Sequence, residues 1–210
     1  MTLVYDKIAD RYDRMHRTWL RHAGGTAQAA FEASVLARLH PGIDMLDAGC
    51  GTGEFARHLC ADHGADINLT LFDASAAMLD QAADIPARRR QGCLSAMPFA
   101  ADSFDLVTAA WSIEATDAPQ AALTEMVRVL RPGGTLVTVF CAQRPKVAPI
   151  ARALQMSVKL RKTGQFLSAD SVANHLTTLG VEALTKLRVT GPAAVLTCRK
   201  PFAEPVALAA

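Results

Sequence analysis

A glycine-rich stretch early in the chain constrains the fold more than any other part of the sequence. Residues 45–54 read MLDAGCGTGE, and they continue an apolar run that starts at Ile43. An acid ends the run, and a helical pattern begins after Gly53. A strand, a glycine turn and a helix form the first unit of nucleotide-binding α/β folds. Glycine suits this turn because it allows a tight reversal and lets a ligand lie against bare backbone.

Two kinds of nucleotide cofactor fit a loop of this type. The spacing Gly51-x-Gly53-x-x-Ala56 matches the relaxed dinucleotide pattern, which is a weak signal on its own. A dinucleotide places its pyrophosphate at the helix N-terminus, where the helix dipole favours anions. Here Glu54 stands in the first helical turn and Asp47 at the strand end, so a pyrophosphate would meet two carboxylates. The acids therefore favour a phosphate-free cofactor over the nicotinamide cofactor of an oxidoreductase.

Several motifs carry a resemblance to a known family. The pattern D-x-G-x-G-x-G at 47–53 is similar to the first motif of class I S-adenosylmethionine (SAM) dependent methyltransferases. DASAAML at 73–79 resembles the family's second motif, while GCLSAMPF at 92–99 and DSFDLV at 102–107 resemble the third and fourth. LRPGGTL at 130–136 is a turn typical of the same fold. The chain most resembles the small-molecule, type 11 (UbiE-like) group, which implies methyl transfer from SAM with S-adenosylhomocysteine as product.

The resemblance also implies an architecture. It predicts an α/β fold with a Rossmann-like, doubly wound, seven-stranded sheet, mostly parallel with an antiparallel last strand, and helices on both faces. At 210 residues the chain is most simply a single domain. Within 1–210 we expect an N-terminal helical lid at 1–40 and a cofactor-binding core at 43–140. A substrate-covering insertion at 141–167 and a C-terminal helix and hairpin at 168–200 complete the prediction.

The lid segment contains a regular apolar face. Tyr5, Ile8 and Tyr12 recur at helical spacing, so they share one side of a helix. That side either packs on the domain or, as the resemblance implies, lies over the cofactor with Tyr12 near its methionine end. The glycine pair at 24–25 predicts a break, followed by a second helix over 26–39 with the threonine as its N-cap.

The resemblance assigns the cofactor site residue by residue. Asp73 ends the second predicted strand, where a carboxylate can accept two hydrogen bonds from vicinal ribose hydroxyls. Position 93 departs from the family pattern, because Cys93 stands where an acid usually accepts from the adenine amino group. The backbone around Cys93 and Leu94 would then read the adenine. The implied cofactor-binding residues are Tyr12, Asp47, Gly49, Gly51, Thr52, Gly53, Asp73, Ala74, Met78, Cys93, Leu94 and Ala109.

The methyl acceptor is expected beside the fourth strand. The apolar run at 104–110 has the composition of a buried parallel strand, and its end delivers Trp111 to the carboxyl edge of the sheet. Trp111 either walls the pocket or stacks on an aromatic or cationic substrate. With Tyr5 it is a candidate substrate contact. The sequence does not fix the acceptor, nor whether nitrogen, oxygen, sulfur or carbon is methylated.

A catalytic base is not specified by the motifs. Many relatives carry histidines just after the fourth strand, where this chain has Glu114-Ala-Thr. His16, Asp13 and Glu114 are therefore the candidate bases, although an amine or acidic hydroxyl that is held in line needs none. The missing histidines and Cys93 leave a second hypothesis open, namely a SAM-binding or partner-regulated protein without catalysis.

The composition excludes several other classes of partner. A net charge of +2 is too small an excess to predict nucleic-acid binding. No apolar run approaches the ~18 residues of a membrane span. The five cysteines form no CxxC pair and have no histidines at metal-ligand spacing. We therefore expect reduced thiols, no metal, a cytoplasmic location, a small-molecule substrate, and a monomer or homodimer.

A basic segment follows the core motifs. Residues 126–169 contain no acid but many arginines and lysines. Ile150, Leu154 and Val158 recur at helical spacing, which predicts a basic amphipathic helix. Such a helix either presents a solvated face or covers an anionic or lipophilic acceptor. A peripheral contact with an acidic membrane surface is a further interpretation.

Overall fold

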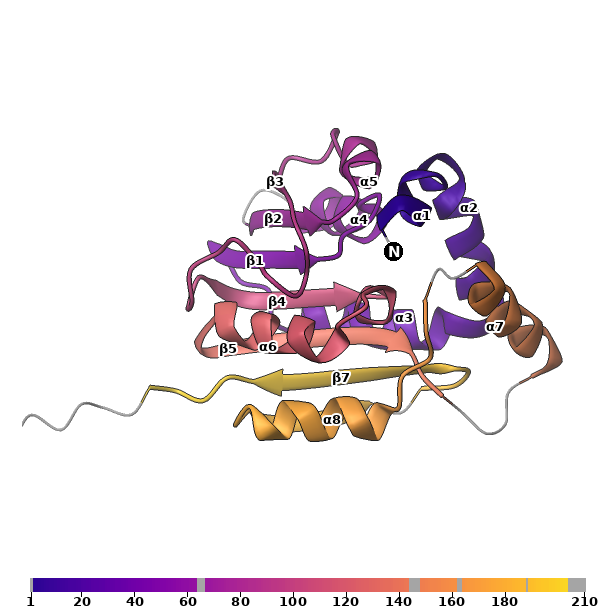
Figure 1. The fold of residues 1–210 in the computed structure, drawn as a ribbon. Helices are drawn as coiled ribbons and strands as arrows, with labels where there is room; N and C mark the ends of the chain where they lie inside the picture. Colours follow the sequence, from indigo (N-terminus) through magenta and orange to yellow (C-terminus); the bar gives the residue numbers. More distant parts are fainter. Residues whose placement is uncertain (1, 64–66, 144–147, 162–163, 188, 204–210) are drawn as a thin grey trace, which may run out of the picture.

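The computed structural model describes residues 2–63, 67–143, 148–161, 164–187 and 189–203. Helices and strands alternate along most of this chain (Figure 1). In chain order the elements are α1 (Thr2–Asp6), α2 (Ala9–Trp19), the π-helical turn η1 (Leu20–Gly24), α3 (Gly25–Leu36), β1 (Ile43–Ala48), α4 (Glu54–His63), β2 (Ile67–Asp73), α5 (Ala76–Gln81), β3 (Arg88–Gln91), β4 (Phe104–Ala110), the 3₁₀ turn η3 (Ile113–Ala115), α6 (Pro119–Val129), β5 (Leu130–Cys141), α7 (Pro149–Arg161), α8 (Ala169–Thr178), β6 (Glu182–Leu187) and β7 (Ala193–Arg199).

The strands make one seven-stranded sheet in the order β3-β2-β1-β4-β5-β7-β6. The central strand β1 pairs in parallel with β2 and β4, and β5 continues the parallel set beside β4. β7 runs antiparallel to both β5 and β6, as the predicted C-terminal hairpin requires. The expected Rossmann-like sheet with an antiparallel last strand is therefore confirmed.

Local sequence signals explain where the helices begin and end. Ser75 caps α5 by accepting a hydrogen bond from the Met78 N–H at 3.2 Å. Ser168 caps α8 in the same way. Pro119 opens α6 at a position where its missing N–H costs nothing. Gly180 follows the C-cap of α8 and ends the helix with a φ of +75°, which glycine adopts without strain.

Two hydrophobic cores lie on opposite faces of the sheet. Met45 and Leu106 point to one face, where they pack with α3 and α4. Their neighbours Leu46 and Val107 point to the other face, where they pack with α6 and α8. Side chains alternate along a strand, so each central strand needs apolar residues on both faces to fill both cores. This is why the central strands appear in the sequence as continuous apolar runs.

The site-bearing edge of the sheet is the one at which β1, β2 and β4 end. Figure 1 shows α1, α2 and α7 gathered beyond the carboxyl ends of these strands. In open parallel sheets ligands bind outside these ends, at the point where the strand order reverses. That reversal lies between β1 and β4 in this sheet.

The glycine pair does not break the N-terminal helices. Gly24 and Gly25 both have right-handed helical backbone, and η1 carries α2 directly into α3. The physical reason is packing, because a Cβ on Gly24 would lie 2.6 Å from Nε1 of Trp19 and 2.9 Å from Trp111. The predicted N-cap was therefore wrong, and Thr26 instead donates a hydrogen bond to the carbonyl of Thr190.

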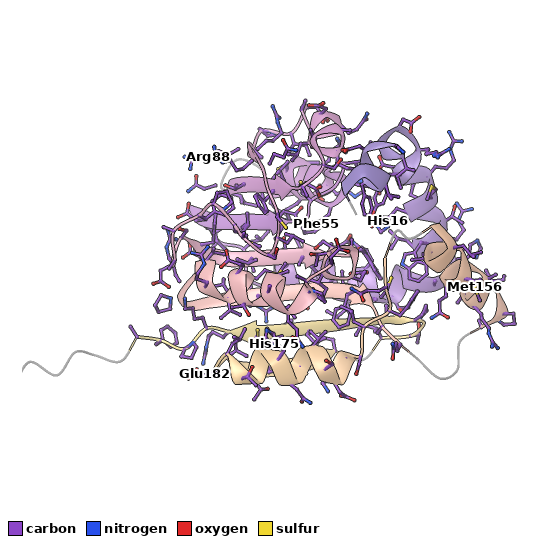
Figure 2. All side chains as sticks on the ribbon, viewed as in Figure 1. His16, Phe55, Arg88, Met156, His175 and Glu182 are labelled. Atoms are coloured by element: carbon purple, nitrogen blue, oxygen red, sulfur yellow. The ribbon has the colours of Figure 1, made fainter. Side chains whose placement is uncertain are left out.

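The predicted apolar face of α7 is only partly buried. Leu154 and Val158 pack against the core on the α3 side of the sheet. Ile150 is 58% exposed, so it does not share their environment. Figure 2 shows Met156, also largely exposed, on the same helix. No helix among the described residues has the length and apolarity that a bilayer crossing needs.

Two arginines at the start of the basic segment form ion pairs with acids. Arg128 pairs with Glu125 at 2.6 Å. Arg131 pairs with Asp44 at 2.8 Å and with Asp105 at 2.7 Å. Asp44 and Asp105 lie near the amino ends of β1 and β4, and Glu125 comes just before the segment on α6. Residues 144–147, 162 and 163 lie outside the described residues, as do the side chains of Lys159 and Arg161.

Candidate functional site

The glycine loop between β1 and α4 uses its three glycines for different purposes. All three have positive φ: Gly49 at +79°, Gly51 at +56° and Gly53 at +75°. A Cβ on Gly49 would lie 2.3 Å from Ser112, and one on Gly53 would lie 2.4 Å from Ile85, so these two permit close packing. A Cβ on Gly51 would meet only the Tyr12 ring, at 3.9 Å. Gly51 is thus the glycine that leaves space for a ligand.

A cavity of about 370 Å³ opens over this loop. Its floor is made by the β1–α4 loop and by the segments that follow β2, β3 and β4. Its cover comes from α1, α2 and α3. Of the residues implied by the family resemblance, those that line it are Tyr12, Gly49, Gly51, Thr52, Asp73, Ala74, Met78, Cys93 and Leu94.

Three of the expected cofactor residues lie behind the cavity wall. Asp47 is 2% exposed and accepts a hydrogen bond from the Thr108 hydroxyl at 3.0 Å. Burial raises the pKa of Asp47 to about 7. Gly53 packs on Ala82 and Ile85, which follow α5, and Ala109 is fully buried in the core on the α6 side of the sheet. The neighbour of Ala109, Ala110, lines the cavity instead.

Asp73 connects the two loops that form the floor. One carboxylate oxygen accepts the N–H of Gly51, and the other accepts the N–H of Ser75, each at 2.9 Å. Each carboxylate oxygen has a second lone-pair direction, so the group keeps capacity for further donors. Burial raises the pKa of Asp73 above its usual range. The carboxylate therefore lines the cavity with unused capacity to accept hydrogen bonds.

Polar contacts fasten the N-terminal helices to the floor. The Thr52 hydroxyl donates to Asp13 on α2 at 2.5 Å. Arg17, one turn further along α2, pairs with Glu54 at 3.2 Å. On α1, Asp6 accepts a hydrogen bond from the Ser75 hydroxyl. Asp13, a candidate base, therefore contacts the loop. It lines neither this cavity nor the second cavity beside it.

A second cavity of about 260 Å³ adjoins the first. Its described wall is largely aromatic and aliphatic and comes from α1, α2, α7 and the segment after β4. Both predicted substrate contacts lie in the wall that the two cavities share. The shared residues are Tyr5, Tyr12, His16 and Trp111.

Trp111 has a strained backbone at this shared wall. Its φ is +54°, which is a rare value for a bulky residue, and its N–H donates to the Val139 carbonyl at 2.8 Å. The indole Nε1 donates to the Gln28 side chain at 2.7 Å. Strain of this kind collects at functional sites, where surrounding contacts hold it in place. The motifs did not indicate Gln28, because it reaches Trp111 only through the packing of α3.

Burial changes the protonation of the candidate bases. His16 lies within stacking distance of Tyr12, with ring centroids 5.6 Å apart. Figure 2 shows it on α2, at the end of the molecule opposite Arg88. Burial lowers the pKa of His16 to about 4, so the ring is neutral at neutral pH. Glu114 is 3% exposed, and burial raises its pKa to about 7. Across the described residues no cluster of His, Cys, Asp and Glu has the arrangement of a metal site.

The sequence comparisons identify a methyltransferase family. A family model described as a methyltransferase domain matches residues 46–138. The chain is 31% identical over 156 residues to a demethylmenaquinone methyltransferase from Desulfitobacterium hafniense, covering 67% of this chain and 58% of that protein. It is 30% identical over 210 residues to a malonyl-[acyl-carrier protein] O-methyltransferase from Enterobacter lignolyticus, covering 96% of this chain and 72% of that protein. The chain spans little more than half the length of several other curated relatives.

Solved structures share the fold at lower identity. A SAM-dependent methyltransferase from Thermotoga maritima has a TM-score of 0.72 at 20% identity, covering 95% of this chain and 99% of that one. The [4+2]-cyclase SpnF has a TM-score of 0.69 at 22% identity, covering 83% and 82%. At these identities the structures show the fold alone, whereas the Enterobacter alignment runs along nearly the whole sequence. The chain belongs to the S-adenosylmethionine-dependent methyltransferase family.

Proposed function

We propose that the chain transfers a methyl group from SAM to a small, lipophilic acceptor and releases S-adenosylhomocysteine. The observation that carries this proposal is the pair of adjoining cavities with a common aromatic wall. The cavity over the glycine loop suits a nucleoside, and the apolar cavity beside it suits an acceptor. A methyl group would pass where the two meet, at Tyr12 and Trp111.

The residues of the first cavity fit SAM. Gly51 leaves its side of the loop bare, and Asp73 retains acceptor capacity for the two ribose hydroxyls. Met78 and Leu94 are buried apolar side chains that line the cavity and suit the faces of an adenine ring. SAM carries no phosphate, so the carboxylates around the loop do not oppose it.

The protein's task in such a reaction is mainly alignment. Bound SAM supplies a methyl group that its sulfonium has already activated. The aromatic wall excludes water, and the two cavities hold the partners at a fixed distance and direction, which can account for much of the rate enhancement. His16 and Glu114 are the described groups of the second cavity that can accept a proton. His16 is available in its neutral form because burial lowers its pKa to about 4.

Two measurements test the proposal. Titration calorimetry with SAM, S-adenosylhomocysteine and NAD should show binding of the first two and none of the third. A release assay for S-adenosylhomocysteine across amine, phenol, carboxylate and lipid acceptors should then find turnover. NAD binding in the cavity would contradict the proposal at the cofactor.

A second candidate function is SAM binding without methyl transfer. It is favoured by Cys93, which is exposed at the cavity and contacts Ser95 at 3.1 Å. Tight SAM binding with no S-adenosylhomocysteine released from any acceptor class would support this candidate. The fold also houses a [4+2]-cyclase, so SAM binding alone does not demonstrate methyl transfer.

A further inference from the structure

The second cavity contains a buried carboxyl group with an unused oxygen. Glu114, on η3, is 3% exposed and lines this cavity. Its Oε1 accepts the N–H of Cys141 at 2.8 Å. Its Oε2 is buried without a hydrogen-bond partner of ordinary geometry, and the side chain that interacts with the carboxyl is the Cys141 thiol, a weak donor. A buried acceptor without a strong donor is costly, so this oxygen marks a place where a ligand's donor would be stabilised.

The walls around this carboxyl are rich in aromatic rings. Tyr5, Tyr12, Trp19 and Trp111 all line the cavity. Successive rings are in contact, with centroids 6.0 Å apart for the tyrosine pair and 5.9 Å apart for the tryptophan pair. Aromatic faces attract organic cations, and the attraction grows when water is excluded.

The described lining holds no positive charge to balance Glu114. It contains neither lysine nor arginine. The imidazole of His16 is the remaining basic group, and burial keeps it neutral at neutral pH by lowering its pKa to about 4. The cavity therefore offers a ligand the Glu114 carboxyl as acceptor and the faces of aromatic rings. No positively charged side chain among its described residues balances that carboxyl.

We propose that the methyl acceptor is an amine on a small apolar body, with its nitrogen held at Glu114 Oε2 within the ring of Tyr5, Tyr12, Trp19 and Trp111. This inference rests on the methyl-transfer function proposed above. A hydroxyl group could donate to the same oxygen, but only an amine also supplies the charge that offsets a buried carboxylate. An anionic acceptor would meet Glu114 with no cation beside it among the described residues of the lining.

The proposed transfer balances without a further reactant. An acceptor that enters as an ammonium ion gives one proton to the Glu114 carboxylate and becomes a neutral amine. The nitrogen lone pair then forms the N–C bond to the methyl group, while the C–S bond breaks and its electron pair remains on sulfur. The product is a methylated ammonium ion beside neutral S-adenosylhomocysteine, and the aromatic rings stabilise its charge.

Binding can be measured without turnover, because Trp19 and Trp111 are the chain's two tryptophans and both line this cavity. The full chain is first saturated with S-adenosylhomocysteine, and its binding is checked by calorimetry. Tryptophan fluorescence is then titrated with 2-phenylethylamine, 2-phenylethanol and 3-phenylpropionate, which share an apolar body and differ in the polar group. We expect the amine to bind at least tenfold more tightly than the other two.

Variants separate the carboxyl's role from general packing. Glu114→Gln keeps the size of the side chain and should weaken amine binding at least fivefold, while the affinities for 2-phenylethanol and S-adenosylhomocysteine stay the same. Asp170→Asn, at a solvent-exposed acid on α8, is the matched control and should change none of the three affinities.

Three results would overturn the amine assignment once S-adenosylhomocysteine binding is established. These are equal or tighter binding of the alcohol or the carboxylate, an unchanged amine preference in folded Glu114→Gln, and no fluorescence change with any of the three compounds at millimolar concentration. A failure of S-adenosylhomocysteine to bind would instead count against the proposed function. The calorimetric step therefore distinguishes the two failures.

Discussion

Gly51 and Asp73 are joined by one hydrogen bond across the floor of the first cavity. The carboxylate orders the glycine loop and, as proposed, also receives the ribose. We expect Asp73→Ala to weaken SAM binding by about 1–3 kcal/mol, because the hydroxyls lose a charged acceptor. Titration calorimetry measures the change. Asp73→Asn keeps one acceptor oxygen, so its SAM affinity should lie between those of the parent and Asp73→Ala. An unchanged affinity in Asp73→Ala would show that the ribose lies elsewhere.

Gly51 allows a test of the space above the loop. A valine there would project its branches toward the Tyr12 ring, into the cavity, so we expect Gly51→Val to abolish SAM binding. Backbone strain alone could also weaken binding, because the φ of Gly51 is +56°. Gly180→Val is the matched control, since Gly180 has a φ of +75° with open space around it and lies outside both cavities. Full SAM binding by a folded Gly51→Val protein would contradict the prediction.

The residues that could be predicted from sequence are those whose role is set by neighbours in the chain. Gly51 and Asp73 belong to this group, because a strand end and the turn after it fix where they lie. Gln28 and Trp19 could not be predicted, since they reach the site through the packing of helices against strands distant in sequence. The prediction for Asp47 also relied on its position at a strand end, but its side chain turns toward Thr108 and away from the cavity.

The two acids at the glycine loop, Glu54 and Asp47, are less exposed as negative charges than their positions in the sequence suggest. Glu54 does line the first cavity, as its place in the first turn of α4 suggests. However, Arg17 from α2 pairs with it, and Asp47 is buried with a pKa raised to about 7. The acids therefore oppose a pyrophosphate less than their sequence positions imply, and the family match supports the SAM assignment more strongly than charge does.

At the level of elements, both α1 and α2 of the predicted lid contact the floor of the first cavity. We expect Asp13→Ala to remove the bond to Thr52, and so to increase amide hydrogen exchange in α2 and weaken SAM binding a few-fold. Exchange measured by mass spectrometry, together with calorimetry, would test this. Asp10→Ala, at an exposed acid on the same helix, is the control. Equal exchange in the two variants would show that this contact does not hold the lid.

The basic segment shows why element-scale predictions from charge are limited. Along the chain, Arg128 and Arg131 stand in a run without acids after Met126. In the fold, acids from β1, β4 and α6 surround them and complete ion pairs. Sequence shows charges in one dimension, whereas pairing depends on which elements the sheet brings together. The central strands were predictable because buried parallel strands appear in a sequence as nearly continuous apolar runs.

For the whole molecule, the buried acids predict how stability depends on pH. The folded pKa of Asp47, about 7, lies above its ordinary value of 3.8, so the folded protein binds the proton more tightly than the unfolded chain does. The contribution of Asp47 to the free energy of unfolding is therefore greatest below pH 4, and it is lost as the pH rises through 7. We expect Asp47→Asn to become more stable relative to the parent as the pH is raised from 5 to 8, as measured by urea unfolding.

The contribution of His16 to stability changes with pH in the opposite direction, so it partly offsets the contribution of Asp47 in the parent protein. Its folded pKa of about 4 lies below its ordinary value of 6.5, so its contribution is present above pH 6.5 and is lost as the pH falls through 4. The comparison must therefore be made between variant and parent at each pH. Asp80→Asn, at an exposed acid, serves as the control, and parallel curves for Asp47→Asn and the parent would contradict the prediction.

The uninterrupted passage from α2 through η1 into α3 limits how a ligand can reach either cavity. Phe31 and Val35 of α3 are fully buried in the core between α3 and the sheet. The C-terminal end of α2 therefore cannot move outward without pulling these side chains out of the core. At the other end α1 is short, the chain turns at residues 7 and 8 before α2 begins, and a hydrogen bond joins Asp6 to Ser75. Nucleoside exchange would then proceed by release of the first few residues, and removing them should accelerate cofactor dissociation while leaving the sheet intact.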